Sequence, residues 1–154
     1  MKRTKTALIT GATGGIGQAL CSRFARQGYR LIITGRNPAR LNRLAQRLCS
    51  AYGTEVRCIG MDLGVKGTAR ELCARLDQMG AVVDVLVNNA GFGLGGPFVE
   101  NQPEVQQQML YVNIHAVTEL CRRLLPGMME RGWGRILNVA STGSFVPGPY
   151  NGVY

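Results

Sequence analysis

A glycine-rich turn near the start of the chain is the first stretch whose residue types could do chemistry. Residues 10–17 read Thr-Gly-Ala-Thr-Gly-Gly-Ile-Gly, between an apolar run at 7–9 and a helical pattern over 18–24. The N-terminus of such a helix has free backbone N–H groups and the positive end of the helix dipole, which attract an anionic pyrophosphate. The strand, turn and helix order therefore predicts a phosphate cradle.

Three glycines of this turn have distinct expected roles. Gly11 can take the tight turn, Gly15 can let a ligand approach the backbone, and Gly17 can let the helix pack closely on the strand. Their spacing is G-x-x-x-G-x-G, not the common dinucleotide fingerprint G-x-G-x-x-G, and a chance cluster is the alternative in a chain with 21 glycines. The candidate cofactor-binding residues of the turn are Gly11, Thr13, Gly15, Ile16 and Gly17.

An arginine follows the second strand pattern, where dinucleotide folds show their cofactor preference. In such folds an acid about 20 residues past the turn binds the ribose 2′-OH, and an arginine accommodates a 2′-phosphate instead. Residues 34–36 read Thr-Gly-Arg, and no carboxylate occurs before Glu55. Arg36 can offer paired, charge-assisted hydrogen bonds, so the sequence favours NADP(H). The alternative is that Arg36 is a solvated residue before a helix cap.

Alternating strand and helix patterns must position these residues. Strand patterns cover 7–9, 30–34, 55–59, 82–87 and 135–140, and helical patterns lie between them. Because β-α-β crossovers give parallel strands, we predict an α/β fold with helices on both faces of the sheet, in one domain over 1–154. Asp62, just after the third strand pattern, lies where ligands of such sheets gather, and its alternative role is capping of the next helix.

Two local signals concern the helices. Thr68 to Glu71 has the spacing of a capping box and should start a helix that ends near Gly80. A long helical pattern from Glu104 toward Arg131 contains Pro126, which should kink or end it.

Composition and cysteine usage exclude several classes of protein. The 45% apolar and 18% charged content of the 154 residues matches a soluble globular domain, and the first apolar stretch is too short for a signal peptide or a membrane span. The five cysteines are odd in number and scattered without a C-x-x-C, which favours neither disulfides nor a metal site. We expect a cytoplasmic protein without metal.

The net charge of +9 is concentrated in the first third of the chain. Ten Lys/Arg and no acid occur up to Thr54, against eight Lys/Arg and nine acids afterwards. A basic segment could bind nucleic acid. Most of these arginines fall on helical patterns, where a solvated outer face explains them, so we expect no nucleic-acid partner and keep a basic nucleic-acid-binding domain as the weakest alternative.

Five motifs in register resemble the short-chain dehydrogenase/reductase family. They are Thr10-Gly11-x-x-x-Gly15-Ile16-Gly17, Asp62-Leu63, Asn88-Asn89-Ala90-Gly91, Asn113 and Ser141, and together they cover the whole chain. The resemblance implies a Rossmann-like, doubly wound parallel sheet of strand order 3-2-1-4-5. It also implies that Asp62 and Leu63 lie by the adenine, with Asn89 and Gly91 beside the ribose and the central strand.

The resemblance further implies hydride transfer between NADP(H) and a small-molecule carbonyl or alcohol. Ser141 would hydrogen-bond the substrate oxygen, Tyr154 would be the acid or base, and Asn113 would hold a water. Tyr154 lies thirteen residues past Ser141, whereas Tyr150, only nine past it, is the poorer match. A free tyrosine titrates near about 10, so a nearby cation is needed to favour the phenolate; in the family, a lysine four residues after the tyrosine supplies it.

The sequence stops at Tyr154, before the position of that lysine. Complete family members have a further helix and two last strands, so we expect the N-terminal part of a longer reductase that is a homodimer or homotetramer when intact. Alone, the chain should be inactive and prone to aggregate, because strand 135–140 would be an exposed edge. The alternative is a natural short form that binds NADP(H) without catalysis.

Overall fold

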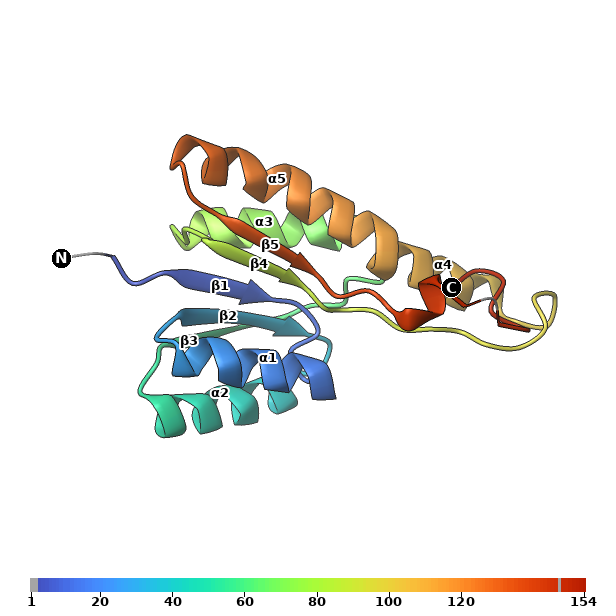
Figure 1. Ribbon diagram of the computed structural model, residues 1–154, viewed down its shortest axis with the longest axis horizontal. Helices are drawn as coiled ribbons and strands as arrows, with labels where there is room; N and C mark the ends of the chain where they lie inside the picture. The colour runs from blue at the N-terminus through green and yellow to red at the C-terminus, as the bar shows by residue number, and fades with distance from the viewer. Residues whose placement is uncertain (1–2, 147) are drawn as a thin grey trace.

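Five parallel strands form the central sheet, in the order β3-β2-β1-β4-β5 (Figure 1). The strands are β1 (Thr6–Ile9), β2 (Arg30–Gly35), β3 (Val56–Gly60), β4 (Val85–Asn88) and β5 (Arg135–Asn138). The computed structural model describes residues 3–146 and 148–154. The predicted order 3-2-1-4-5 is confirmed, and it places a topological switch point between β1 and β4, where ligands of doubly wound sheets bind.

Helices cover both faces of this sheet (Figure 1). One face carries α1 (Gly15–Arg26) and α2 (Pro38–Tyr52), and the other carries α3 (Thr68–Gln78) and α5 (Ala116–Glu130). A shorter helix, α4 (Pro103–Leu110), runs into α5 through one π-helical turn, Tyr111–His115. None of the described helices combines the length and the apolar run that a membrane crossing requires.

The core is split in two by the central strands. Neighbouring side chains on a strand point to opposite faces, so Leu8 and Leu86 pack in the layer under α3 and α5, while Ile9 and Val87 pack in the layer under α1 and α2. Every residue of β1 and β4 is buried. Two-sided burial explains why these strands are continuous apolar runs and not alternating ones.

Strand register brings distant segments to one edge of the sheet. Ile9 pairs with Ile33 on β2 and with Val87 on β4. The residues that follow these three strands therefore emerge together at the carboxyl edge. This edge is where the glycine turn, the Thr34–Arg36 stretch and the Asn88–Gly91 stretch meet.

The predicted start of α3 needs correction. The helix-capping residue of α3 is Gly67, at φ +87°, and not Thr68, whose hydroxyl instead donates to the carbonyls of Asp62 and Val65 at 2.8 and 2.7 Å. The capping box is wrong because the left-handed Gly67 starts the helix one residue earlier, which turns the Thr68 hydroxyl back toward the preceding loop.

Pro126 was expected to kink or end the long helix, and the second of these alternatives is wrong. Pro126 lies inside α5, which continues to Glu130. The regular α-helical pattern breaks at the π-helical turn instead, fifteen residues before the proline at its first residue, Tyr111. The predicted open edge of the sheet is present. Among the described strands, β5 pairs only with β4, and its residue Leu137 is exposed.

Candidate functional site

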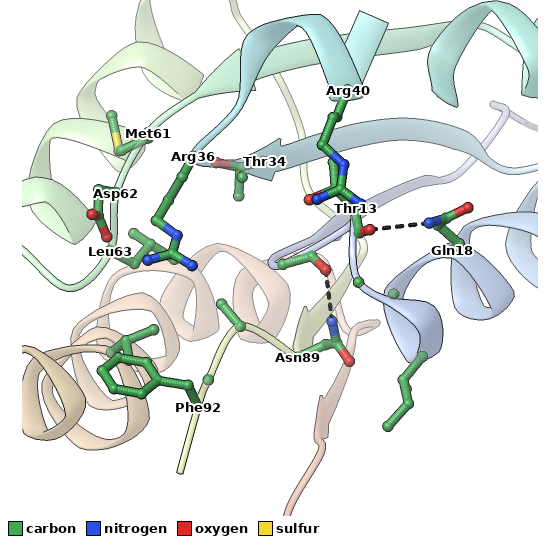
Figure 2. A pocket seen from close by; sticks show the side chains of 18 of the residues that line it. Thr13, Gln18, Thr34, Arg36, Arg40, Met61, Asp62, Leu63, Asn89 and Phe92 are labelled. Atoms are coloured by element: carbon green, nitrogen blue, oxygen red, sulfur yellow. Dashed lines mark hydrogen bonds between the residues drawn. The ribbon is translucent and has the colours of Figure 1, made fainter. Parts of the chain in front are cut away.

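A cavity of about 530 Å³ lies at the carboxyl edge of the sheet, over the switch point between β1 and β4 (Figure 2). Its wall consists of the glycine turn, the end of β2, the loop after β3 and the segment after β4. All of the predicted cofactor-binding residues line it: Gly11, Thr13, Gly15, Ile16, Gly17, Arg36, Asp62, Leu63, Asn89 and Gly91. Four separate segments of sequence thus form one site.

The three glycines of the turn differ in what surrounds them. Gly11 has φ +63°, and a Cβ there would lie 2.7 Å from the Cα of Ala90. A Cβ on Gly17 would overlap the carbonyl oxygen of Gly11, so only glycine lets α1 start this close to the turn. Gly15 has no atom within 4 Å of the position of a Cβ, which leaves room for a ligand against the backbone.

The start of α1 offers unpaired N–H groups to the cavity. Its capping residue, Gly14, makes no side-chain cap, and its first turn has no acid. Gln18 donates to the carbonyl of Thr13 at 3.0 Å (Figure 2) and accepts from Arg47 of α2 at 2.8 Å. The turn is therefore braced from the neighbouring helix, and the start of α1 stays electropositive.

The segment after β4 is tied to the same turn. Thr10 Oγ1 accepts from the amides of Asn89 and Ala90 at 3.0 and 2.9 Å. The Asn89 side-chain amide donates to the carbonyls of Thr10 and Gly11 at 2.9 and 3.1 Å. The Asn89 amide group is thus occupied in holding two walls of the cavity in register.

Arg36 and Asp62 lie at the far end of the cavity from α1. In Figure 2 the Arg36 side chain extends from the end of β2 toward Leu63. Asp62 Oδ1 accepts from the amide of Gly64 at 2.9 Å, within its own loop. Because Gly67 caps α3, the alternative of Asp62 as the helix cap is wrong.

Several residues of this cavity were not predicted from sequence. They are Gly14, Gln18, Thr34, Gly35, Arg40, Met61, Ala90, Phe92 and Val112. Arg40 is the one that a sequence signal could have found: it lies in the first turn of α2, just after the Asn37-Pro38 helix start. Met61 and Phe92 carry no such signal, because apolar residues beside a strand end are usually core.

A second cavity of about 490 Å³ adjoins the first and shares with it the segment from Asn89 to Phe92. It is lined by all three predicted catalytic residues, Asn113, Ser141 and Tyr154. They come from the π-helical turn, the loop after β5 and the last residue of the chain. The fold therefore brings together residues that are up to 41 positions apart.

Asn113 is held firmly in this cavity. Its Oδ1 accepts from the amide of Phe92 at 3.2 Å, and its Nδ2 donates to the carbonyl of Phe92 at 2.9 Å. A Cβ on Gly91 would lie 2.8 Å from Asn113 Oδ1, so a glycine is needed there for this approach. Both side-chain polar atoms of Asn113 are thus committed to the segment after β4.

Tyr154, and not Tyr150, lines the second cavity. A Cβ on Gly143 would lie 3.3 Å from the Tyr154 ring, a tight approach, and one on Gly93 would lie in ordinary contact with it at 3.5 Å. Ser141 Oγ accepts from the amide of Gly143 at 3.0 Å. Tyr150 has φ +65° and a side chain that is 65% exposed, outside the cavity.

Two oxidoreductases are similar to this chain in sequence. The chain is 33% identical over 153 residues to an uncharacterized oxidoreductase of Staphylococcus epidermidis, covering 99% of this chain and 64% of that protein. It is 35% identical over 148 residues to the NADP-dependent 3-hydroxy acid dehydrogenase YdfG of Escherichia coli, covering 96% of this chain and 58% of that protein.

Solved structures of related enzymes have the same fold as this chain. A short-chain dehydrogenase from Sphingobium yanoikuyae in complex with NADPH matches with a TM-score of 0.90 at 33% identity, over 97% of this chain and 58% of that one. The L-sorbose reductase from Gluconobacter frateurii, complexed with NADPH and L-sorbose, matches with a TM-score of 0.89 at 31% identity, over 97% and 57%. The chain spans less than two thirds of the length of each of these relatives. The family model for short chain dehydrogenases matches residues 5–154, and the chain belongs to that family.

Proposed function

We propose that this chain is the cofactor-binding part of an oxidoreductase that transfers a hydride between NADP(H) and a carbonyl or alcohol group of a small molecule. One observation carries the proposal: a cavity suited to a phosphorylated dinucleotide shares the wall from Asn89 to Phe92 with a second cavity that is lined by Ser141 and Tyr154. Three similar proteins support the same cofactor and reaction type: YdfG is an NADP-dependent dehydrogenase, and the Sphingobium yanoikuyae dehydrogenase and the L-sorbose reductase form complexes with NADPH.

The residues present fit NADP(H). The unpaired N–H groups at the start of α1 would bind the pyrophosphate, with the open space at Gly15 allowing close approach. Arg36 would bind the 2′-phosphate, because it lines the cavity and no acid lies on the first turn of α2. Leu63 and Asp62 would lie against the adenine at the far end.

The second cavity would perform the proton chemistry, while bound NADP(H) supplies or accepts the hydride. Ser141 would donate its hydroxyl hydrogen to the substrate oxygen and so orient the carbonyl. Tyr154 would give its phenolic proton to that oxygen as it becomes an alcohol, or take it back in the reverse direction. Asn113 would keep the wall between the two cavities in place through its two bonds to Phe92.

Fluorescence titration with NADPH, followed by turnover on a panel of carbonyl compounds, tests the proposal. We expect saturable NADPH binding that is lost in Arg36→Asp, since a carboxylate there repels the 2′-phosphate. Absence of NADPH binding by a folded sample contradicts the proposal. Turnover that survives Tyr154→Phe contradicts the role of Tyr154.

We further propose that the whole protein is cytoplasmic and assembles as a homodimer or homotetramer. Exposed apolar side chains along α5 and its preceding turn, Ile114, Leu125 and Met129, support an assembly surface. Light scattering across a dilution series checks this, and a monomer at all concentrations contradicts it.

A further inference from the structure

A cavity of about 210 Å³ lies at the amino edge of the sheet. The amino ends of the strands are opposite the carboxyl ends, where the cofactor site lies (Figure 1). Strand β2 connects the two edges: it begins at Arg30, which lines this cavity, and ends at Gly35, which lines the nucleotide cavity. The amino-edge cavity shares no lining residue with the nucleotide cavity or with the cavity that contains Tyr154, so it is a separate site.

The lining of the amino-edge cavity combines charged and apolar side chains. The charged ones come from the N-terminal segment and from the starts of β2 and β3, and they are Arg3, Arg30, Glu55 and Arg57. The apolar ones include three residues of the turn between α3 and β4, namely Met79, Ala81 and Val82. A ligand of this cavity would therefore contact both kinds of surface.

Two of the three arginines have an acidic partner. Arg3 forms an ion pair with the buried Asp84, whose Oδ2 also accepts from the amide of Thr6 at 2.8 Å. Arg57 Nε donates to Glu55 Oε1 at 2.7 Å. The charges of these two arginines are thus compensated within the protein, and both side chains are held in place beside the cavity.

Arg30 is the third arginine, and it has no acidic partner among residues 3–146 and 148–154. The side chain is half-buried, Nη2 donates to the carbonyl of Thr4 at 3.2 Å, and Nε is buried without a hydrogen-bond partner. Buried donors are nearly always paired, and a guanidinium group has five of them. An oxyanion in the cavity would supply both the missing acceptor and the missing charge.

The turn before β4 provides a preformed apolar surface. Gly80 has φ +59°, and the amide of Ala81 donates to the carbonyl of Leu76 at 2.9 Å, so the end of α3 is closed and the turn is fixed. Met79 and Ala81 are half-buried, and Val82 is 38% exposed. A ligand with a short apolar chain would bury part of this surface, whereas inorganic phosphate would leave it wet.

We propose that the amino-edge cavity binds a small organic acid, whose carboxylate pairs with Arg30 and whose apolar chain lies against Met79, Ala81 and Val82. A monoanion matches the single arginine that lacks an acidic partner. The apolar lining favours an alkyl or aryl carboxylate over an inorganic anion. Because the cavity is separate from the nucleotide cavity, such an acid and NADPH bind the chain independently.

Calorimetric titration of the wild-type chain with hexanoate, at constant ionic strength, tests this site. We expect one hexanoate per chain. Hexanamide, which has the same length without the charge, should bind at least tenfold more weakly, because it forms no charge-assisted bond to Arg30. Butyrate, which is two CH₂ groups shorter, should bind about tenfold more weakly than hexanoate. Saturating hexanoate should leave the affinity for NADPH within about twofold.

Two arginine variants separate Arg30 from the general positive charge of the chain. Arg30→Gln should weaken hexanoate binding at least tenfold. Arg26→Gln, which removes an exposed arginine of α1 outside the cavity, should leave it within about twofold. Val82→Glu places an acid in the same cavity and should also abolish hexanoate binding, so this variant replaces Arg30→Gln if the glutamine variant does not fold.

Four results would overturn the inference. They are a wild-type chain that does not bind hexanoate, equal binding of hexanoate and hexanamide, unchanged hexanoate binding in Arg30→Gln, and competition between hexanoate and NADPH. The last result would mean that the acid binds in the nucleotide cavity. Hexanoate binding by a chain that does not bind NADPH would support this site and contradict only the proposed function.

Discussion

Replacing Thr34 by valine should make the cofactor-free protein more stable. The Thr34 side chain is fully buried on β2 and its hydroxyl has no partner among residues 3–146 and 148–154, so the folded state carries the desolvation of that group, about 1–3 kcal/mol, without compensation. Valine has nearly the same shape, is also β-branched, and adds apolar contact. We expect a gain of about 1–2 kcal/mol in the free energy of unfolding and a rise in Tm of roughly 2–8 °C.

Thermal unfolding followed by circular dichroism, without cofactor, measures this effect. Thr10→Val provides the contrast, because it removes a donor to the carbonyl of Val87 and leaves the amides of Asn89 and Ala90 without their acceptor. That variant should lose about 2–5 kcal/mol. If Thr34→Val loses stability as Thr10→Val does, the Thr34 hydroxyl has a partner in the free protein and the reasoning fails.

Two further predictions concern the glycine turn and the cysteines. Gly17→Ala should lower the melting temperature, because its Cβ would overlap the carbonyl oxygen of Gly11. Gly15→Ala, whose Cβ meets no atom, should melt at or above the wild-type temperature and yet bind NADPH more weakly. Equal melting temperatures for the two variants would contradict this reasoning. Burial raises the pKa of the Cys21 thiol to about 12, so the reactive thiolate is scarce at pH 8. Iodoacetamide should therefore label Cys21 far more slowly than the exposed Cys49. Peptide mass spectrometry after a timed reaction measures the two labelling rates.

The sheet and its cofactor site could be predicted because their signals are local and repeated. Each strand that is buried on both faces is a continuous apolar run, and a parallel sheet brings every strand's carboxyl end to one edge. The residues after β1, β2, β3 and β4 were therefore expected to meet, and they do, from Gly11 to Gly91.

Features set by tertiary contacts could not be predicted in this way. The π-helical turn has no sequence signal; it accompanies the position of Asn113 against Phe92, which requires the folded loop after β4. The predicted capping box was wrong because Gly67, with its left-handed φ, and not Thr68, is the N-cap residue of α3. Arg40 follows the helix start that Asn37 and Pro38 mark, but sequence periodicity alone does not show that the first turn of this helix borders a cavity.

Strand order has a consequence for how this chain folds as it is synthesised. Ala7 on β1 pairs with Leu31 on β2 and also with Val85 on β4. The pairing of β1 is therefore complete only when β4, 78 residues further along the chain, is present. By the logarithmic dependence on loop length, closing that longer loop costs about 1 kcal/mol more chain entropy than closing the first. Since the N-terminal strands also leave the ribosome first, β1, β2 and β3 should dock before β4 arrives. Pulse-labelled hydrogen exchange would show the Ile32 amide protected before that of Leu86, and simultaneous protection would mean that the two halves of the sheet form in one step.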